Sequence, residues 1–142
     1  MAKHLAVFVE NKPGKLEKIT RTLLEANINI RAISIQDRGD FGVIKLLVDK
    51  PQSAEQALKS AGFVCALREI IAVEMEDKPG GLHKIAEIFS KNNINILDAY
   101  GFVIESSKIA VLCVEVEKVL GLDEILQKEG LKIISDYDLY GL

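Results

Sequence analysis

The chain has 142 residues, of which 49% are hydrophobic and 6% aromatic, and its formal net charge is -3. The apolar fraction excludes a disordered chain, and the acidic balance with few aromatics argues against binding to phosphate backbones along a basic stripe. No apolar run reaches the roughly 18 residues of a membrane span, and the first residues lack the features of a signal peptide. We therefore expect a cytoplasmic protein with no nucleic-acid or membrane partner.

The first elements along the chain are a strand, a turn and a helix. Leu5, Val7 and Val9 alternate with the other residues of 4–10, which predicts a strand, and Pro13-Gly14 predicts the turn. The residues Leu16, Ile19 and Leu23 recur at helical spacing, and Asn27 suits the left-handed conformation in which many helices end. The elements expected next are strands over 28–37 and 41–49 with a turn at 38–40, a helix around 54–58 ending at Gly62, and a strand over 63–69.

A shift of 66 residues places the second half of this chain on the first. Residues 11–16 (Asn-Lys-Pro-Gly-Lys-Leu) align with 77–82 (Asp-Lys-Pro-Gly-Gly-Leu), and both 27–30 and 93–96 read Asn-Ile-Asn-Ile. Between 5 and 30, 13 of 26 aligned positions are identical. The second copy predicts the same elements: a strand around 71–75, a turn at Pro79-Gly80, a helix over 82–89, strands over 94–104 and 109–117, a helix around 122–126 ending at Gly130, and a last strand over 131–139.

The order strand, helix, strand, strand, helix, strand predicts an α+β protein made of two ferredoxin-like βαββαβ units. Each unit should have an antiparallel sheet with both helices on one face. We place the domains at 1–69 and 70–142. Residues 63–75 form a nearly continuous apolar stretch, so the last strand of one unit should run directly into the first strand of the next.

The sheet faces away from the helices are expected to be apolar. Over 109–114 both sets of alternate residues, which point to opposite faces of a strand, are apolar. In the first unit, one face is expected to carry Ile33, Ile35, Val43 and Leu47, and the opposite face Ile44, Leu46 and Val48. Uncovered apolar faces of this size are interaction surfaces. The sequence therefore predicts a homodimer that forms through the sheet faces.

The two Pro-Gly turns are candidate anion sites. Gly14 and Gly80 each open a helix directly after a proline, which suits a first helical turn. Free amides at a helix start favour a carboxylate or phosphate, and glycine allows a ligand to approach closely. The alternative is a tight turn that needs glycine for its backbone geometry only.

A second pair of candidates stands at the start of a strand in each copy. Asn29 and Asn95 lie between isoleucines, where an amide is a poor strand former. An amide both donates and accepts hydrogen bonds, so it suits the ammonium and the carboxylate of an amino acid. The alternative is an asparagine that caps the nearby helix end or a sheet edge.

With its Asn/Asp-Lys-Pro-Gly-x-Leu motif and its later Asn-Ile-Asn-Ile motif in both copies, nearly the whole chain resembles a pair of ACT domains. These are the amino-acid-sensing regulatory modules of 3-phosphoglycerate dehydrogenase, aspartokinase and the regulatory subunit of acetohydroxyacid synthase. The resemblance implies an amino acid bound at the interface between two ACT units, held by the loop of one and the strand start of the other. The residues implied are Asn11, Gly14, Lys15, Asn29, Ile30, Asp77, Gly80, Gly81, Asn95 and Ile96.

Two departures from the family pattern bear on the ligand. A histidine precedes the loop asparagine by two residues in the serine-binding dehydrogenase, where this sequence has Val9 and Met75. Asp77 replaces Asn11 in the second copy and suits an ammonium group by its charge. The resemblance therefore argues against a serine-type site, and the two copies can differ in ligand or affinity.

No enzyme is predicted, and no cofactor or metal. The two histidines, His4 and His83, lie in no cluster of metal-ligand spacing, and Cys65 and Cys113 read as small core residues. Residues 38–43 (Arg-Gly-Asp-Phe-Gly-Val) are similar to an RNA-recognition signature, but the stacking aromatics are missing.

The sequence therefore predicts a non-catalytic regulatory protein that binds a small amino acid and signals to a metabolic enzyme or pathway. The alternative is an interaction subunit that docks on a biosynthetic or acyl-activating enzyme without sensing a ligand.

Overall fold

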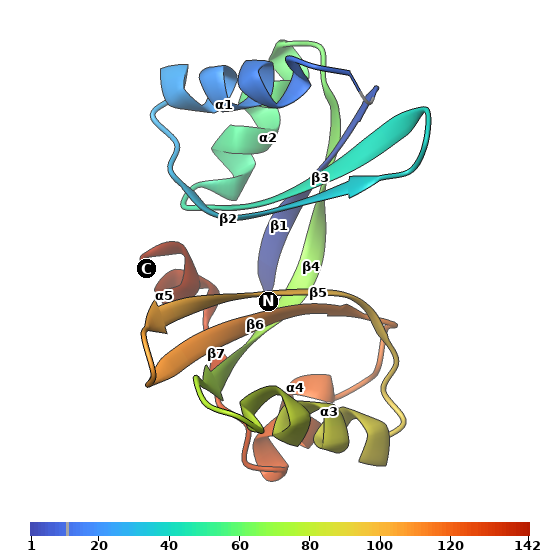
Figure 1. Ribbon diagram of the computed structural model, residues 1–142, viewed down its shortest axis with the longest axis vertical. Helices are drawn as coiled ribbons and strands as arrows, with labels where there is room; N and C mark the ends of the chain where they lie inside the picture. The colour runs from blue at the N-terminus through green and yellow to red at the C-terminus, as the bar shows by residue number, and fades with distance from the viewer. Residues whose placement is uncertain (11) are drawn as a thin grey trace. The chain divides into compact units, whose positions relative to one another are not determined.

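The computed structural model describes residues 1–10 and 12–142 in two compact units (Figure 1). Asn11, a predicted loop contact, lies outside the described residues. The N-terminal unit comprises Lys3–Glu69 and Tyr140–Leu142, and the C-terminal unit comprises Ile70–Leu139 and Met1–Ala2. The units therefore divide between residues 69 and 70, while each end of the chain groups with the opposite unit, which the boundaries 1–69 and 70–142 did not foresee.

In the N-terminal unit a four-stranded sheet carries two helices on one face. Its sheet has the order β2-β3-β1-β4, in which β1 and β2 both run antiparallel to β3. The elements are β1 (Ala2–Glu10), α1 (Lys15–Glu25), β2 (Ile30–Asp37), β3 (Phe41–Val48), α2 (Pro51–Ser60) and the first half of β4 (Val64–Glu76). Figure 1 shows α1 and α2 together on one side of these strands. The predicted βαββαβ order is confirmed.

The C-terminal unit repeats this arrangement. Its strand order is β5-β6-β4-β7, and each neighbouring pair is antiparallel. The elements are the second half of β4, α3 (Gly81–Lys91), β5 (Ile96–Glu105), β6 (Ile109–Val116), α4 (Leu122–Lys128), β7 (Ile133–Ile134) and α5 (Asp136–Tyr140). As predicted from the continuous apolar stretch, one uninterrupted strand, β4, joins the two copies.

The last predicted strand, over 131–139, is wrong. Only β7 is extended, and helix α5 begins two residues after it. The Ser135 hydroxyl accepts a hydrogen bond from the backbone N–H of Asp138 at 3.1 Å, as a helix-capping serine does. The carboxylates of Asp136 and Asp138 also favour the first turn of a helix. These capping groups outweigh the apolar alternation of the segment.

Each unit has its own core between sheet and helices. In the N-terminal unit Leu5 and Val7 of β1 pack in a buried cluster that includes Ile19 and Leu23 of α1. The C-terminal core has the equivalent residues, and Phe89 of α3 is its largest fully buried side chain. Burying one such side chain contributes about 1.5–3 kcal/mol, so these helix faces fix the position of each helix on its sheet.

The predicted grouping of apolar residues into sheet faces is wrong in the first unit. A register shift between Ile30 and Ala32 pairs Ile33 with Leu46 and Ile35 with Ile44. Directly paired residues share a face, so both isoleucines lie on the helix side of the sheet, with the core residues. Because β2 is an edge strand, they remain 44% and 56% exposed.

The second unit departs from the predicted faces differently. Val111 and Cys113, which alternate with the core residues Leu112 and Val114, are buried as well. This strand therefore does not offer the uncovered apolar face on which the homodimer prediction was based. Exposed apolar side chains are found on both edge strands, at Ile33 and Ile35 of β2 and at Leu97 and Val103 of β5.

Both helix-ending asparagines adopt the predicted left-handed conformation. The backbone φ angle is 56° at Asn27 and 55° at Asn93. Asparagine tolerates this region better than other residues with a Cβ, because its short polar side chain can bond locally. The repeated asparagine is therefore explained by the end of the first helix in each copy.

Substituting these asparagines tests that explanation. Asn27→Ala and Asn93→Ala are each expected to lower the free energy of unfolding by about 1–2 kcal/mol, whereas the glycine variants change it by less than about 0.5 kcal/mol. Urea denaturation followed by circular dichroism measures both. Asn29→Ala, at an exposed position without a positive φ, is the control. Equal losses for alanine and glycine would contradict the conformational explanation.

Candidate ligand-binding site

The Pro-Gly turns have the same backbone geometry in both copies. Gly14 and Gly80 are the N-cap residues of α1 and α3, with φ angles of 88° and 87°. The sequence had suggested that the prolines belong to the first helical turn. They instead precede the helix, because the N-cap is the glycine that follows each of them. A Cβ on either glycine would meet nothing within 4 Å, so the backbone angle is what requires glycine, and the space beside each turn is open.

The next residue makes the two turns different. A Cβ on Gly81 would lie 2.1 Å from the backbone oxygen of Glu76 and 3.5 Å from Cγ of Met75. The start of α3 is therefore pressed against the end of β4, at a distance that only glycine permits. In the first copy the same position holds Lys15, which is half-buried.

An ion pair flanks each turn. The Lys12 ammonium lies 2.8 Å from the Glu10 carboxylate, and the Lys78 ammonium lies 2.5 Å from the Glu76 carboxylate. The hydrogen bond from the lysine, more than any other cause, lowers the pKa of Glu10 and of Glu76. Both carboxylates are therefore ionised at neutral pH.

Asp77 is used within its own unit. Its Oδ2 accepts a hydrogen bond from the backbone N–H of Ser107 at 2.7 Å, and its own N–H donates to the Lys108 carbonyl at 3.1 Å. Ser107 has a φ of 63° in the turn between β5 and β6. Asp77 thus holds this strained hairpin turn, a role that sequence reasoning missed.

Asn29 and Asn95 present their side chains to solvent. Both residues are exposed and stand directly before the edge strands β2 and β5. The backbone of Asn29 is bound to Asp49, which accepts from its N–H at 3.0 Å and donates to its carbonyl at 3.1 Å. Within residues 1–10 and 12–142, neither side-chain amide has a hydrogen-bond partner. The capping alternative is therefore not observed there.

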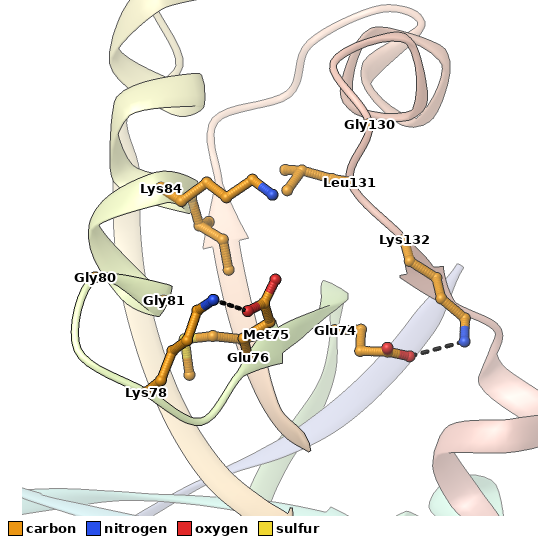
Figure 2. Close-up of a pocket in the computed structure, with 11 residues that line it drawn as sticks. Glu74, Met75, Glu76, Lys78, Gly80, Gly81, Lys84, Gly130, Leu131 and Lys132 are labelled. Carbon is orange, nitrogen blue, oxygen red and sulfur yellow. Dashed lines mark ion pairs between the residues drawn. The ribbon is translucent and has the colours of Figure 1, made fainter. Parts of the chain in front are cut away.

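A cavity of about 280 Å³ lies beside the second Pro-Gly turn (Figure 2). Its walls come from the end of β4, the start of α3 and the segment between α4 and β7. The lining residues are Glu74, Met75, Glu76, Lys78, Gly80, Gly81, Lys84, Ile85, Gly130, Leu131 and Lys132. Of the predicted site residues it includes Gly80 and Gly81, while Asp77, Asn95 and Ile96 are not among its lining.

The cavity combines an apolar floor with charged side chains. Ile85 and Leu131 are buried, whereas Lys84 and Lys132 are exposed. The Lys132 ammonium lies 2.8 Å from a carboxylate oxygen of Glu74. That hydrogen bond is the main cause that raises the pKa of Lys132. Sequence reasoning missed these charges, because the segment at 130–132 is distant in sequence from the turn that it meets.

Two ferredoxin-like units in one chain define a tandem α+β repeat protein. A family model described as an ACT domain pair matches residues 1–142. The chain therefore belongs to the ACT domain pair family, as its motifs predicted, and such pairs are typical of regulatory proteins that bind amino acids.

Solved structures agree with this assignment. A protein from Bacteroides thetaiotaomicron is 29% identical, with a TM-score of 0.92 over 99% of this chain and 96% of that one. The ligand-free regulatory subunit of aspartate kinase from Thermus thermophilus is 17% identical, with a TM-score of 0.67 over 90% and 89%. The latter likeness shows the fold alone. No protein of curated function matches the chain in sequence.

Two further observations concern the described residues. They contain no group of three or more His, Cys, Asp and Glu side chains that could hold a metal ion. None of the helices over 1–10 and 12–142 is long and apolar enough to cross a membrane.

The difference between Gly81 and Lys15 can be measured. Gly81→Ala is expected to lower the free energy of unfolding by about 2–3 kcal/mol, because the new methyl group collides with the Glu76 carbonyl. Lys15→Ala, at the equivalent position of α1, should change it by less than about 0.5 kcal/mol. Urea denaturation compares the two. A Gly81→Ala variant as stable as the wild type would contradict the close contact.

Proposed function

We propose that this protein is a non-catalytic regulator that binds a small amino acid through its Pro-Gly turns and its strand-start asparagines. The observation that carries the proposal is the duplicated pair of exposed amides, Asn29 and Asn95, which have no hydrogen-bond partner among the described residues. An unengaged amide beside an edge strand contributes nothing evident to the fold. It is available to a ligand that needs both a donor and an acceptor.

The turns supply the complementary charge. The first turns of α1 and α3 carry partial positive charge, and the open space beside Gly14 and Gly80 allows a carboxylate to approach them. The Lys15 and Gly81 amides already donate to the Lys12 and Lys78 carbonyls, so the proposal assigns the ligand to the amides that follow them. Lys15, Ile30, Gly81 and Ile96 then border the ligand, and Asn11 and Asp77 are the remaining proposed loop contacts. Because Asp77 already accepts a hydrogen bond from Ser107, the proposal gives it a weaker part than Asn95.

The neighbouring unit at each site comes, in this proposal, from a second copy of the chain. Edge strands carry unpaired backbone groups, and β2 and β5 also expose Ile33, Ile35, Leu97 and Val103. Pairing of such edges would bury these side chains and place a strand-start asparagine beside a partner's turn. The proposed homodimer thus uses the edge strands rather than the sheet faces.

The regulated target is proposed to be a metabolic enzyme in the cytoplasm. A structural relative is the regulatory subunit of an aspartate kinase, which supports a separate regulatory chain that acts on an enzyme. Both cysteines are free thiols, as in a reducing compartment. The same exposed edge strands favour a second candidate, an interaction subunit that docks on an enzyme without sensing a ligand.

Isothermal calorimetry with the twenty amino acids tests ligand binding. We expect at least one to bind with a Kd below 1 mM, and Asn29→Ala with Asn95→Ala to weaken it about tenfold or more, the effect of losing a hydrogen bond to a charged group. Gln52→Ala, at an exposed position of α2, is the matched control. If no amino acid binds, the ligand-binding function is disproved and only the second candidate, an interaction subunit, remains.

Sedimentation velocity tests the homodimer. At micromolar concentration we expect a species of twice the 15.7 kDa chain mass. Ile35→Lys should shift the protein toward the monomer, because it places a charge on the paired edge. Val64→Lys, at an exposed apolar position outside β2 and β5, is the control. A wild-type monomer would disprove this form of assembly.

A further inference from the structure

We propose that the cavity beside Gly80 and Gly81 is a binding site for an acidic amino acid, which carries a net charge of -1. The inference rests on the proposed function for its ligand class, but it places the ligand inside one unit rather than between units. Its walls, Met75 to Lys84 on one side and Gly130 to Lys132 on the other, all belong to the C-terminal unit.

The charges of the lining leave one cation unmatched. Glu74 is paired with Lys132 at 2.8 Å, and Glu76 is paired with Lys78 at 2.5 Å. Within the part of the chain that the structure describes, the third lysine, Lys84, forms no ion pair. The lining therefore carries one net positive charge, which favours a ligand of net charge -1 over a neutral zwitterion.

The position of Lys84 suits a carboxylate in the cavity. Figure 2 shows its side chain reaching from α3 toward Leu131 on the opposite wall. The Glu76 carboxylate lies lower in the same cavity and is ionised at neutral pH, since Lys78 and, less strongly, Lys84 lower its pKa. A carboxylate of the ligand would contact Lys84, and the ligand's ammonium group would contact Glu76.

The size and floor of the cavity limit the ligand. A volume of about 280 Å³ is below the roughly 300–1,000 Å³ of sites for drug-sized molecules, so it suits a single amino acid. The apolar side chains of Met75, Ile85 and Leu131 offer only hydrophobic contact to the ligand's methylene groups. They also exclude water from one side of the charged groups, which strengthens their interaction.

The first copy lacks several parts of this site. Lys15 stands where the second copy has Gly81, so the close approach of helix start to strand end that Gly81 permits cannot be repeated there. When the helix-ending glycines Gly62 and Gly130 are aligned, a shift of 68 residues, Val64 stands opposite Lys132. The ion pair Glu74–Lys132 is thus replaced by Phe8 and Val64, both exposed. The acidic ligand is thus assigned to the C-terminal unit alone.

Calorimetry with aspartate, glutamate, asparagine and glutamine tests the inference. We expect the acidic member of at least one pair to bind about tenfold more tightly than its amide, and 0.5 M NaCl to weaken that binding. Lys84→Gln should remove the preference, and Lys84→Arg should keep most of it. Lys18→Gln, at the equivalent exposed position of α1, is the matched control and should leave it unchanged.

The location of the ligand provides an independent readout. In amide NMR spectra, aspartate or glutamate should shift the signals of Gly81, Lys84 and Leu131, and should not shift those of the equivalent Lys15, Lys18 and Phe63. The inference is overturned if the wild-type protein binds acidic and amide ligands equally. It is also overturned if Lys18→Gln removes the preference as Lys84→Gln does. In that case neutral amino acids that bind through Asn29 and Asn95 would leave the proposed function standing. Binding by no amino acid would overturn both.

Discussion

The structure depends on one backbone constraint, the left-handed glycine that joins a strand to a helix in each copy. Gly14 and Gly80 stand directly before α1 and α3, each of which begins five residues after its strand ends at Glu10 or Glu76. Only then do Ile19 and Ile85, one turn further on, reach the apolar face of the sheet. The same geometry leaves the space beside each glycine open, although the Lys15 and Gly81 amides donate to the Lys12 and Lys78 carbonyls. A turn required for folding therefore creates the polar site.

Duplication preserved this backbone while the side chains around it diverged. Both copies keep the lysine that pairs with the last glutamate of the strand, and both keep the asparagine that ends the helix. Two of the differences lie beside the turn, where the alignment places Lys15 opposite Gly81 and Phe8 opposite Glu74. Substitutions that alter a cavity in one copy and not in the other are the change expected when two copies acquire different ligands or partners.

Local chemistry predicted most of the fold, and non-local contacts account for much of what it missed, apart from α5, where the local cap at Ser135 was overlooked. The helices and the left-handed asparagines Asn27 and Asn93 follow from spacing and residue type within one copy. The face of Ile33 does not, because a register shift in the neighbouring residues decides it. The cavity was also inaccessible to a motif search, since Lys132 meets Glu74 across 58 residues of sequence. The repeat located the turns but could not show what packs against them.

The predicted site residues separate into two groups by what already binds them. Asp77 and the flanking glutamates Glu10 and Glu76 are engaged by neighbours in their own unit, so a new contact must share or displace an existing one. Asn29 and Asn95 are exposed and form no side-chain hydrogen bond within the described residues, so a ligand contact costs them no such bond in the protein. The affinity for a ligand should therefore come from contacts with the asparagines and with Lys84. The carboxylates that are already paired should instead determine which charged groups of a ligand are accepted. This division separates the residues that hold a ligand from those that select it.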